Sequence, residues 1–126
     1  MRILIDTHIL IWQLEGDQRL SVERRDLIAD PNNEVLISAA SLWEIAIKSS
    51  LGKLKLSTSF DGLIDHVERS TSVIIPIQPN HLSKLCILEF HNKDPFDRLL
   101  IAQALTEDLS IITSDQHFAA YGVKLL

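Results

Sequence analysis

The chain has 126 residues, a formal net charge of -5 at pH 7, 46% hydrophobic residues and a single cysteine, Cys86. This length and composition indicate one globular domain, residues 1–126, with a core of its own. The negative charge argues against passive nucleic-acid binding through a positive surface, and one cysteine cannot form an intrachain disulfide, so we expect Cys86 to be a small core residue.

The predicted elements alternate between short apolar strands and helices. In chain order they are a strand at 3–5, helices at 7–14 and 21–29, a strand at 35–37, helices at 38–51 and 61–69, a strand at 73–77, helices at 80–88 and 94–109, a strand at 110–113, a helical turn at 116–120 and a strand at 123–125. Pro76 restricts the third strand to an edge or a terminus. Apolar strands that alternate with helices indicate an α/β fold with a mainly parallel sheet covered on both faces.

No apolar run reaches the roughly 20 residues that a membrane-spanning helix needs. The N-terminal segment lacks the basic region and the cleavage site of a signal peptide. We therefore expect a cytoplasmic protein that does not contact membranes.

The stretch KDPFDRLLIAQA places two acids around the start of the helix at 94–109. Asp94 fits an N-cap, Pro95 fits the first helical position, and an acid at Asp97 suits the helix dipole. At about 100° per residue, however, Asp97 projects toward the apolar side of this helix. Asp94 therefore has a sufficient structural role, whereas Asp97 points toward packed structure.

Acids also follow two of the predicted strands. Asp6 comes directly after the strand at 3–5, and Asp115 comes shortly after Thr113. Each acid alone is better explained as an N-cap. Together they are expected at one edge of the sheet, because open parallel sheets bind ligands outside the carboxyl ends of their strands.

Glu44 lies in an apolar helix, where a carboxylate needs a partner. That partner is either Lys48, at i,i+4, or a cation. If Asp6, Glu44, Asp97 and Asp115 converge, they carry about four negative charges at neutral pH, which requires protonation or a bound cation. Carboxylate oxygens suit Mg²⁺ or Mn²⁺, and such an ion supports hydrolysis of phosphodiesters.

Four segments, in this order and at this spacing, resemble a PIN-domain ribonuclease, specifically a VapC-type toxin of a type II toxin–antitoxin pair. They are ILIDTHILIW, ISAASLWEIAIKSSLGKL, HNKDPFDRLLIAQA and IITSDQHFAAY. The resemblance implies a PIN-like three-layer α/β/α sandwich that hydrolyses RNA. It also implies one or two Mg²⁺ or Mn²⁺ ions, a cognate antitoxin that blocks the site, a homodimer, and the metal-binding catalytic residues Asp6, Glu44, Asp97 and Asp115.

Several neighbouring residues have two interpretations. Asp94 is a secondary metal ligand or, by preference, only the N-cap. Arg98 either contacts phosphate or forms a surface salt bridge. Three hydroxyl residues beside the acids either orient a ligand or a water molecule, or simply end strands and cap helices: Thr7, Ser38 and Thr113.

The segment 48–55 is the most basic part of the chain, and it either helps to hold an RNA backbone or is a solvated helix end. Trp12 and Trp43 are expected in the core or at an interface and not as platforms for stacked bases. The five histidines, His117 among them, form no spaced zinc motif.

Two other classes of protein with a similar α/β architecture lack the residues that they need in this sequence. A phospho-receiver module needs an acidic pair near its N-terminus and an Asp after a middle strand, where this chain has Ser38. A phosphatase with an Asp-x-Asp motif fails at His8. The alternatives that remain are a non-toxin PIN nuclease acting in RNA processing or on DNA, and a non-catalytic PIN binding module.

Overall fold

A computed structural model describes all 126 residues and contains one five-stranded sheet. Its elements in chain order are β1 (Arg2–Ile5), α1 (Thr7–Glu15), α2 (Val22–Ala29), β2 (Glu34–Ser38), α3 (Ala39–Ser50), α4 (Phe60–Arg69), β3 (Val73–Ile75), α5 (Pro79–Ile87), α6 (Pro95–Glu107), β4 (Ser110–Ile112), the 3₁₀ helix η1 (Gln116–Tyr121) and β5 (Lys124–Leu125). Every predicted strand and helix is present, with ends shifted by a few residues.

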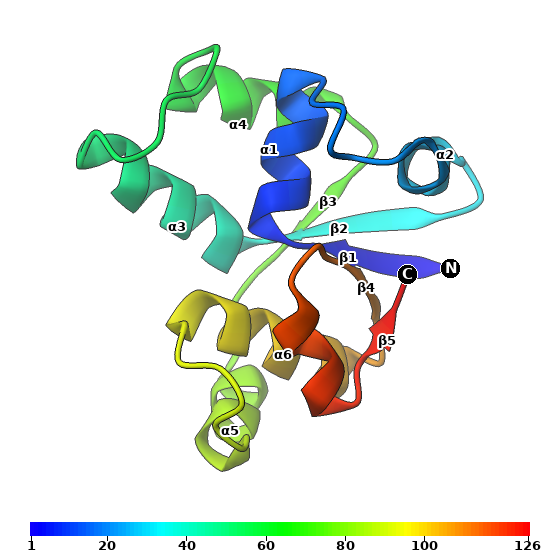
Figure 1. Ribbon diagram of the computed structural model, residues 1–126, viewed down its shortest axis with the longest axis vertical. Helices are drawn as coiled ribbons and strands as arrows, with labels where there is room; N and C mark the ends of the chain where they lie inside the picture. Colours follow the sequence, from blue (N-terminus) through cyan, green and yellow to red (C-terminus); the bar gives the residue numbers. More distant parts are fainter.

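The strand order is β3-β2-β1-β4-β5, and all neighbouring pairs are parallel. Figure 1 shows α1, α3 and α4 on one side of the sheet and α5, α6 and η1 on the other. The predicted three-layer α/β/α sandwich is therefore confirmed, and its sheet is parallel throughout.

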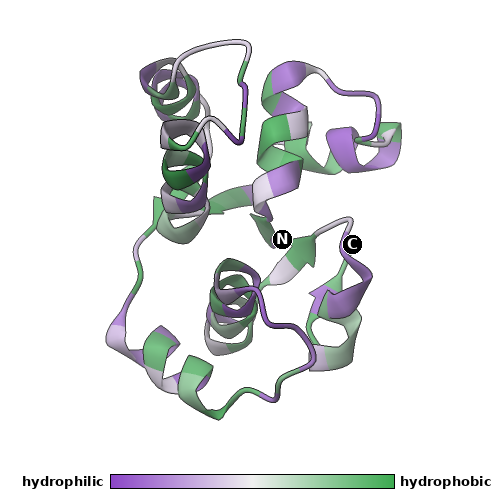
Figure 2. Cartoon of the chain, turned by 60° about the vertical axis from the view of Figure 1, so that its left-hand side comes forward, coloured by the Kyte–Doolittle hydropathy of each residue, from purple (hydrophilic) through white to green (hydrophobic).

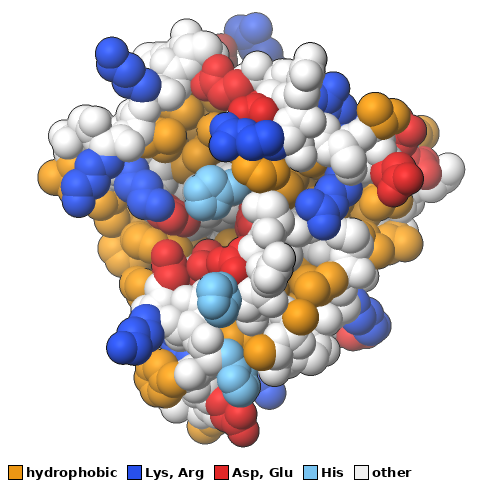
Figure 3. Space-filling model, viewed as in Figure 1, with side chains coloured by type: hydrophobic (Ala, Val, Ile, Leu, Met, Phe, Trp, Pro, Cys, Tyr) orange, Lys and Arg blue, Asp and Glu red, His pale blue; other side chains and the backbone are white.

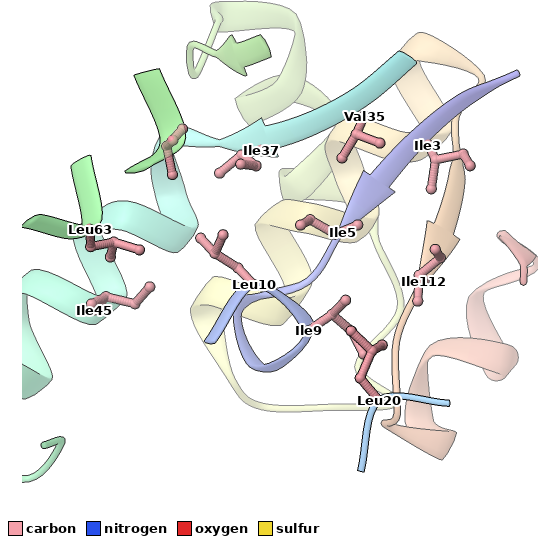
Figure 4. Close-up of a cluster of buried hydrophobic side chains, with 11 residues drawn as sticks. Ile3, Ile5, Ile9, Leu10, Leu20, Val35, Ile37, Ile45, Leu63 and Ile112 are labelled. Carbon is pink, nitrogen blue, oxygen red and sulfur yellow. The ribbon is translucent and has the colours of Figure 1, made fainter. Parts of the chain in front are cut away.

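The two faces of the sheet bury separate clusters, because side chains alternate along a strand. Ile3 and Ile5 point into the cluster beneath α1, α3 and α4, whereas Leu4 between them points toward α6 and η1. Figure 4 shows the first cluster, with strand side chains directed toward Ile9 and Leu10 of α1. The strands are accordingly coloured mostly as hydrophobic in Figure 2.

The strand order places the carboxyl end of β1 between those of β2 and β4. β1 is central, and its last residue, Ile5, pairs with Ile37 of β2 and with Ile112 of β4. The chain moves from β1 to one side through β2 and β3, and later returns to the other side as β4 and β5. This is a topological switch point, the place where α/β sheets bind ligands. Asp6, which follows β1, and Thr113, which follows β4, lie there.

One prediction about a single residue is wrong. Cys86 is exposed and not in the core, because α5 covers α6 and not the sheet. Of the two positions predicted for the tryptophans, Trp12 packs against the first cluster, whereas Trp43 is 57% exposed, which leaves an interface for it.

None of the helices combines the length and the apolar character needed to cross a bilayer.

Candidate active site

Asp6 lies at the centre of the carboxyl edge of the sheet and is 3% exposed. Its Oδ1 accepts a hydrogen bond from the Ile9 amide at 2.8 Å, which caps α1, and its Oδ2 accepts one from the Thr113 hydroxyl. Burial raises the pKa of Asp6, and these two hydrogen bonds offset part of that effect. Thr113 Oγ1 also accepts the Asp115 amide at 3.0 Å. One hydroxyl group thus joins two of the predicted acids.

Glu44 reaches the same region from α3 and is also 3% exposed. Its Oε1 accepts a hydrogen bond from Thr7 Oγ1 at 2.8 Å, and its Oε2 accepts one from Lys48 Nζ at 2.6 Å. The hydrogen bond from Lys48 to Glu44 raises the pKa of Lys48, and the charges of Asp94 and Asp97 add to that effect. Lys48 is therefore the protein partner of this buried carboxylate.

Asp97 lies in the first turn of α6, and the side-chain amide of Asn92 donates a hydrogen bond from Nδ2 to Asp97 Oδ2 at 3.1 Å. Desolvation, together with the charges of Asp94, Asp115 and Glu44, raises the pKa of Asp97 to about 7, although the hydrogen bond from Asn92 lowers it. The expected orientation toward packed structure is correct. Among the predicted acids, Asp97 is the one whose ionisation is most strongly opposed.

Asp94 is the N-cap of α6, as predicted. Its Oδ1 accepts hydrogen bonds from the amides of Phe96 (2.9 Å) and Asp97 (3.1 Å). Its own amide donates to Asn92 Oδ1 at 2.7 Å. Asn92 therefore holds both acids at the start of this helix.

Asp115 caps η1 by accepting the His117 amide at 2.8 Å, and the His117 ring nitrogen Nδ1 lies 2.8 Å from the same oxygen. Burial raises the pKa of Asp115, but the two His117 hydrogen bonds and the charge of this ring outweigh it, so the pKa lies below its ordinary value. The contacts of Asp115 therefore favour its ionised form.

The structure brings the four predicted acids into one electrostatic group, in which the charge of Asp115 raises the pKa of both Asp6 and Asp97, and the charge of Glu44 raises that of Asp97. Figure 3 shows Asp and Glu side chains together in a hollow of one face. The acids come from four different elements, and the folded chain holds them at the switch point of the sheet.

This donor set suits a hard cation in its chemistry, since buried carboxylates that repel one another are stabilised by positive charge. The side chains are not closed around such an ion, and no three His, Cys, Asp or Glu side chains are placed to hold one. Each carboxylate is instead held by a hydroxyl, amide, ammonium or imidazole group of the protein. Binding a cation would require these contacts to loosen.

Ser38 is not in contact with the acids. It caps α3 by accepting the Ala40 amide at 3.0 Å, and its hydroxyl donates to Gln103 Oε1 of α6 at 2.5 Å. Of its two interpretations, the structure supports the cap. Ser38 also fixes α6 to the end of β2 and so sets the position of the helix that carries Asp97.

The position of Arg98 contradicts both predictions for it, a phosphate contact and a surface salt bridge. Its side chain is buried, and its guanidinium donates to the carbonyl oxygens of Glu89 (2.7 Å) and Leu88 (3.3 Å) and to the Tyr121 hydroxyl (3.1 Å). The guanidinium carbon also lies 3.9 Å from the centroid of the Phe90 ring. Arg98 is therefore neither available to phosphate nor part of a surface salt bridge. It fastens the loop before α6 to the body of the protein.

Sequence patterns do not single out Asn92 or His117, which contact Asp97 and Asp115. Their spacing from the two acids is a weak sequence signal for these contacts. Asn92 stands two residues before the Asp94 cap, where short polar side chains bond to the backbone, and His117 stands two residues after Asp115.

The fold and these acids define a three-layer α/β protein with an acidic site at the switch point of its sheet. The family model of the PIN domain matches residues 3–124. The chain therefore belongs to the PIN domain family.

Solved structures share this fold over the whole chain. A structure of VapBC2 from Rickettsia felis bound to a promoter DNA fragment is 19% identical, covers 100% of this chain and 98% of its own, and gives a TM-score of 0.76. DNA-bound VapBC from Salmonella typhimurium is 14% identical, with coverages of 100% and 97% and a TM-score of 0.72. VapC20 from Mycobacterium tuberculosis, a sarcin–ricin loop cleaving toxin, is 15% identical, with coverages of 96% and 95% and a TM-score of 0.69. No curated protein matches the chain.

Proposed function

We propose that this protein is a metal-dependent endoribonuclease and the toxin of a VapC-type toxin–antitoxin pair. The observation that carries the proposal is the placement of Asp97, whose pKa is raised to about 7 by burial and by the charges of Asp94, Asp115 and Glu44. Perturbed carboxylates gathered at one site are typical of catalytic centres. Membership of the PIN domain family supports a nuclease, and the similar fold of a toxin that cleaves the sarcin–ricin loop supports RNA as the substrate.

Asp6, Glu44, Asp97 and Asp115 would hold the Mg²⁺ or Mn²⁺. When bound, such an ion makes water a stronger nucleophile and neutralises charge that develops on a phosphate. The residues around the acids set their orientation, because groups that hydrogen-bond to ligating carboxylates fix their position. That role belongs to Thr113 for Asp6, to Thr7 for Glu44 and to Asn92 for Asp97.

The proposed protein partners are an antitoxin and a second copy of this chain. Two structures of similar fold are named as a toxin–antitoxin complex from Klebsiella pneumoniae and as a member of the VapBC family of toxin–antitoxin systems from Mycobacterium tuberculosis. On this basis we propose a small antitoxin that covers the acidic site of this chain. We also propose a homodimer in the cytoplasm. Exposed large apolar side chains, such as Ile87 at 74% and Phe90 at 80% exposure, offer surface for such contacts.

The first experiment incubates the purified protein with total RNA in Mg²⁺ or Mn²⁺ and then in EDTA. We expect cleavage only with the ion, and loss of most cleavage in Asp6→Asn, Glu44→Gln, Asp97→Asn and Asp115→Asn. The matched control is Asp26→Asn, which removes an exposed carboxylate of α2 that makes no side-chain hydrogen bond.

The outcomes separate the alternatives. Full activity of Asp97→Asn would contradict the assignment of the site. Cleavage of RNA without growth arrest on expression would favour a PIN nuclease in RNA processing. A folded protein that binds the ion but cleaves neither RNA nor DNA would favour a non-catalytic binding module.

A further inference from the structure

A cavity of about 230 Å³ lies between α1, α3 and the segment that follows α3. Three cationic side chains, Arg19, Lys48 and Lys53, line it together with Trp12, and no Asp or Glu does. This lining is unusual for a chain with a net charge of -5. The cavity therefore differs in charge from the acidic site.

The cavity adjoins the acidic site. Thr7 and Lys48 line it, and both side chains also contact the Glu44 carboxylate, at 2.8 Å and 2.6 Å. In Figure 3, the hollow that holds the Asp and Glu side chains is bordered by histidine and by Lys and Arg side chains. A polymer whose phosphate lies at the acids would thus have this cavity beside it.

One wall of the cavity is aromatic. Trp12 packs against the hydrophobic core, which fixes its ring. The exposed His8 ring lies with its centroid 6.3 Å from that of Trp12, and the Arg19 guanidinium carbon lies over the Trp12 ring, 4.9 Å from its centroid. A base that stacks on Trp12 therefore displaces the exposed Arg19 side chain from this face. Aromatic rings and guanidinium planes of this kind are the surfaces on which unpaired bases stack.

The cations of the cavity differ in what they are paired with. Arg19 is bound to Asp17 at 2.7 Å and Lys48 to Glu44 at 2.6 Å. Lys53 is exposed and forms no ion pair. Its ammonium group is therefore the free positive charge that a backbone phosphate would meet.

We propose that this cavity is a nucleotide subsite, which holds one base of single-stranded RNA against Trp12 and the adjoining phosphate at Lys53, next to the bond that is cut. The proposal rests on the ribonuclease function proposed above. The base must be unpaired, because a duplex covers its faces. The volume lies below the roughly 300–1,000 Å³ of sites for drug-sized ligands, which suits one base and no larger RNA element.

The test measures RNA binding in EDTA, so that no cleavage is needed. In a Trp43→Phe variant, Trp12 is the only tryptophan, and we expect a short single-stranded RNA to quench its fluorescence. Trp12→Leu should weaken binding by about tenfold, since a stacked base loses its platform. Circular dichroism checks that this variant folds.

Two lysines of the same segment form a matched pair. Lys53 lines the cavity, whereas Lys55 is also exposed and does not. Lys53→Met should reduce the slope of log K against log salt by about 0.7, the value for one phosphate contact on a single strand. Lys55→Met should leave the slope unchanged.

Failure of the subsite and failure of the ribonuclease function are distinguishable. If the wild type cleaves RNA but RNA does not quench Trp12 and Lys53→Met binds like Lys55→Met, the subsite is wrong and the nuclease stands. If these variants bind RNA normally but lose a protein partner, the cavity is a protein-docking site and the proposal is overturned. If the protein neither binds nor cleaves RNA, both proposals are wrong.

Discussion

At the scale of the residue, the notable feature is that each acid of the site is satisfied differently. Asp6 is buried and accepts the Ile9 backbone amide, Glu44 is paired with Lys48, and Asp115 is held by His117. Asp97 has one neutral donor, Asn92, and is surrounded by like charges. Asp97 is therefore the place where the site stores unfavourable electrostatic energy in the absence of a cation.

The raised pKa of Asp97 predicts a pH dependence of stability. Its folded-state pKa of about 7 exceeds the unfolded value of 3.8, so the folded protein holds a proton that the unfolded chain releases in this range. The free energy of unfolding should therefore fall as pH rises from about 4 to about 7. Asp6, whose pKa is also raised, acts in the same direction.

Urea unfolding in EDTA on both sides of this range measures the effect. We expect a loss on the order of 1–2 kcal/mol, reduced by water that reaches the partly exposed Asp97 carboxylate. Asp97→Asn should remove most of the slope and be the more stable protein above neutral pH. An unchanged slope in Asp97→Asn, equal to that of Asp26→Asn, would show that Asp97 ionises freely.

At the scale of the element, the contacts at the start of α6 fix the positions of Asp94 and Asp97. Asp94 caps the helix, Asn92 positions Asp94 and Asp97, and Arg98 anchors the preceding loop through two carbonyl oxygens and Tyr121. The cap therefore has a structural role that is separate from any ligand role.

Substitution of the cap separates these two roles. Asp94→Ala should lower the free energy of unfolding by about 1 kcal/mol, because two amides at the start of α6 lose their acceptor. Asp94→Asn should be close to wild type in stability, since Asn caps nearly as well. Chemical denaturation at mildly acid pH, where Asp97 is protonated, is the measurement.

Cleavage by Asp94→Asn gives the second half of this test. Near wild-type activity fits a residue that is only a cap. Loss as severe as in Asp97→Asn, in a protein of normal stability, would make Asp94 a metal ligand.

At the scale of the whole molecule, the sheet order gathers charge in one place. β1 lies between β2 and β4 in the sheet, and the acids of the site belong to segments far apart in sequence. The concentration of negative charge there is balanced by protons and by Lys48 when no cation is bound. A cation that binds the folded state should then stabilise the entire domain.

Thermal unfolding tests this without any nuclease assay. Mn²⁺ or Mg²⁺ at about 100 times its Kd should add about 2.7 kcal/mol to the free energy of unfolding. This corresponds to a rise in Tm on the order of 10 °C for a chain of this size. EDTA should reverse the rise, and Asp97→Asn should show little of it, whereas Asp26→Asn should respond like wild type. A wild-type Tm that does not respond to either ion would argue against a metal site.

Local patterns were sufficient for the elements and the class of fold. Apolar strands, N-caps such as Ser21 and Asp94, and helix periodicity depend on residues close in sequence, and these elements appear where predicted. The position of Asp6 and Asp115 after strands also follows from the sequence, because parallel strands end at one edge of the sheet.

Contacts between distant segments could not be predicted in this way. Cys86 is exposed and Arg98 is buried, because each depends on how α5 and the loop after it pack on the rest of the chain. Whether the four acids bind a metal remains a prediction.

The sequence by itself determined the succession of strands and helices along the chain, the parallel α/β class, and the positions of Asp6 and Asp115 after strands. All of these arise from local hydrogen bonding and periodic burial. Only the tertiary structure decided that Thr113 links Asp6 to Asp115 and that a basic cavity lies beside Glu44. Such contacts join segments up to 107 positions apart, and they exist only after the helices pack onto the sheet and fix the direction of each side chain.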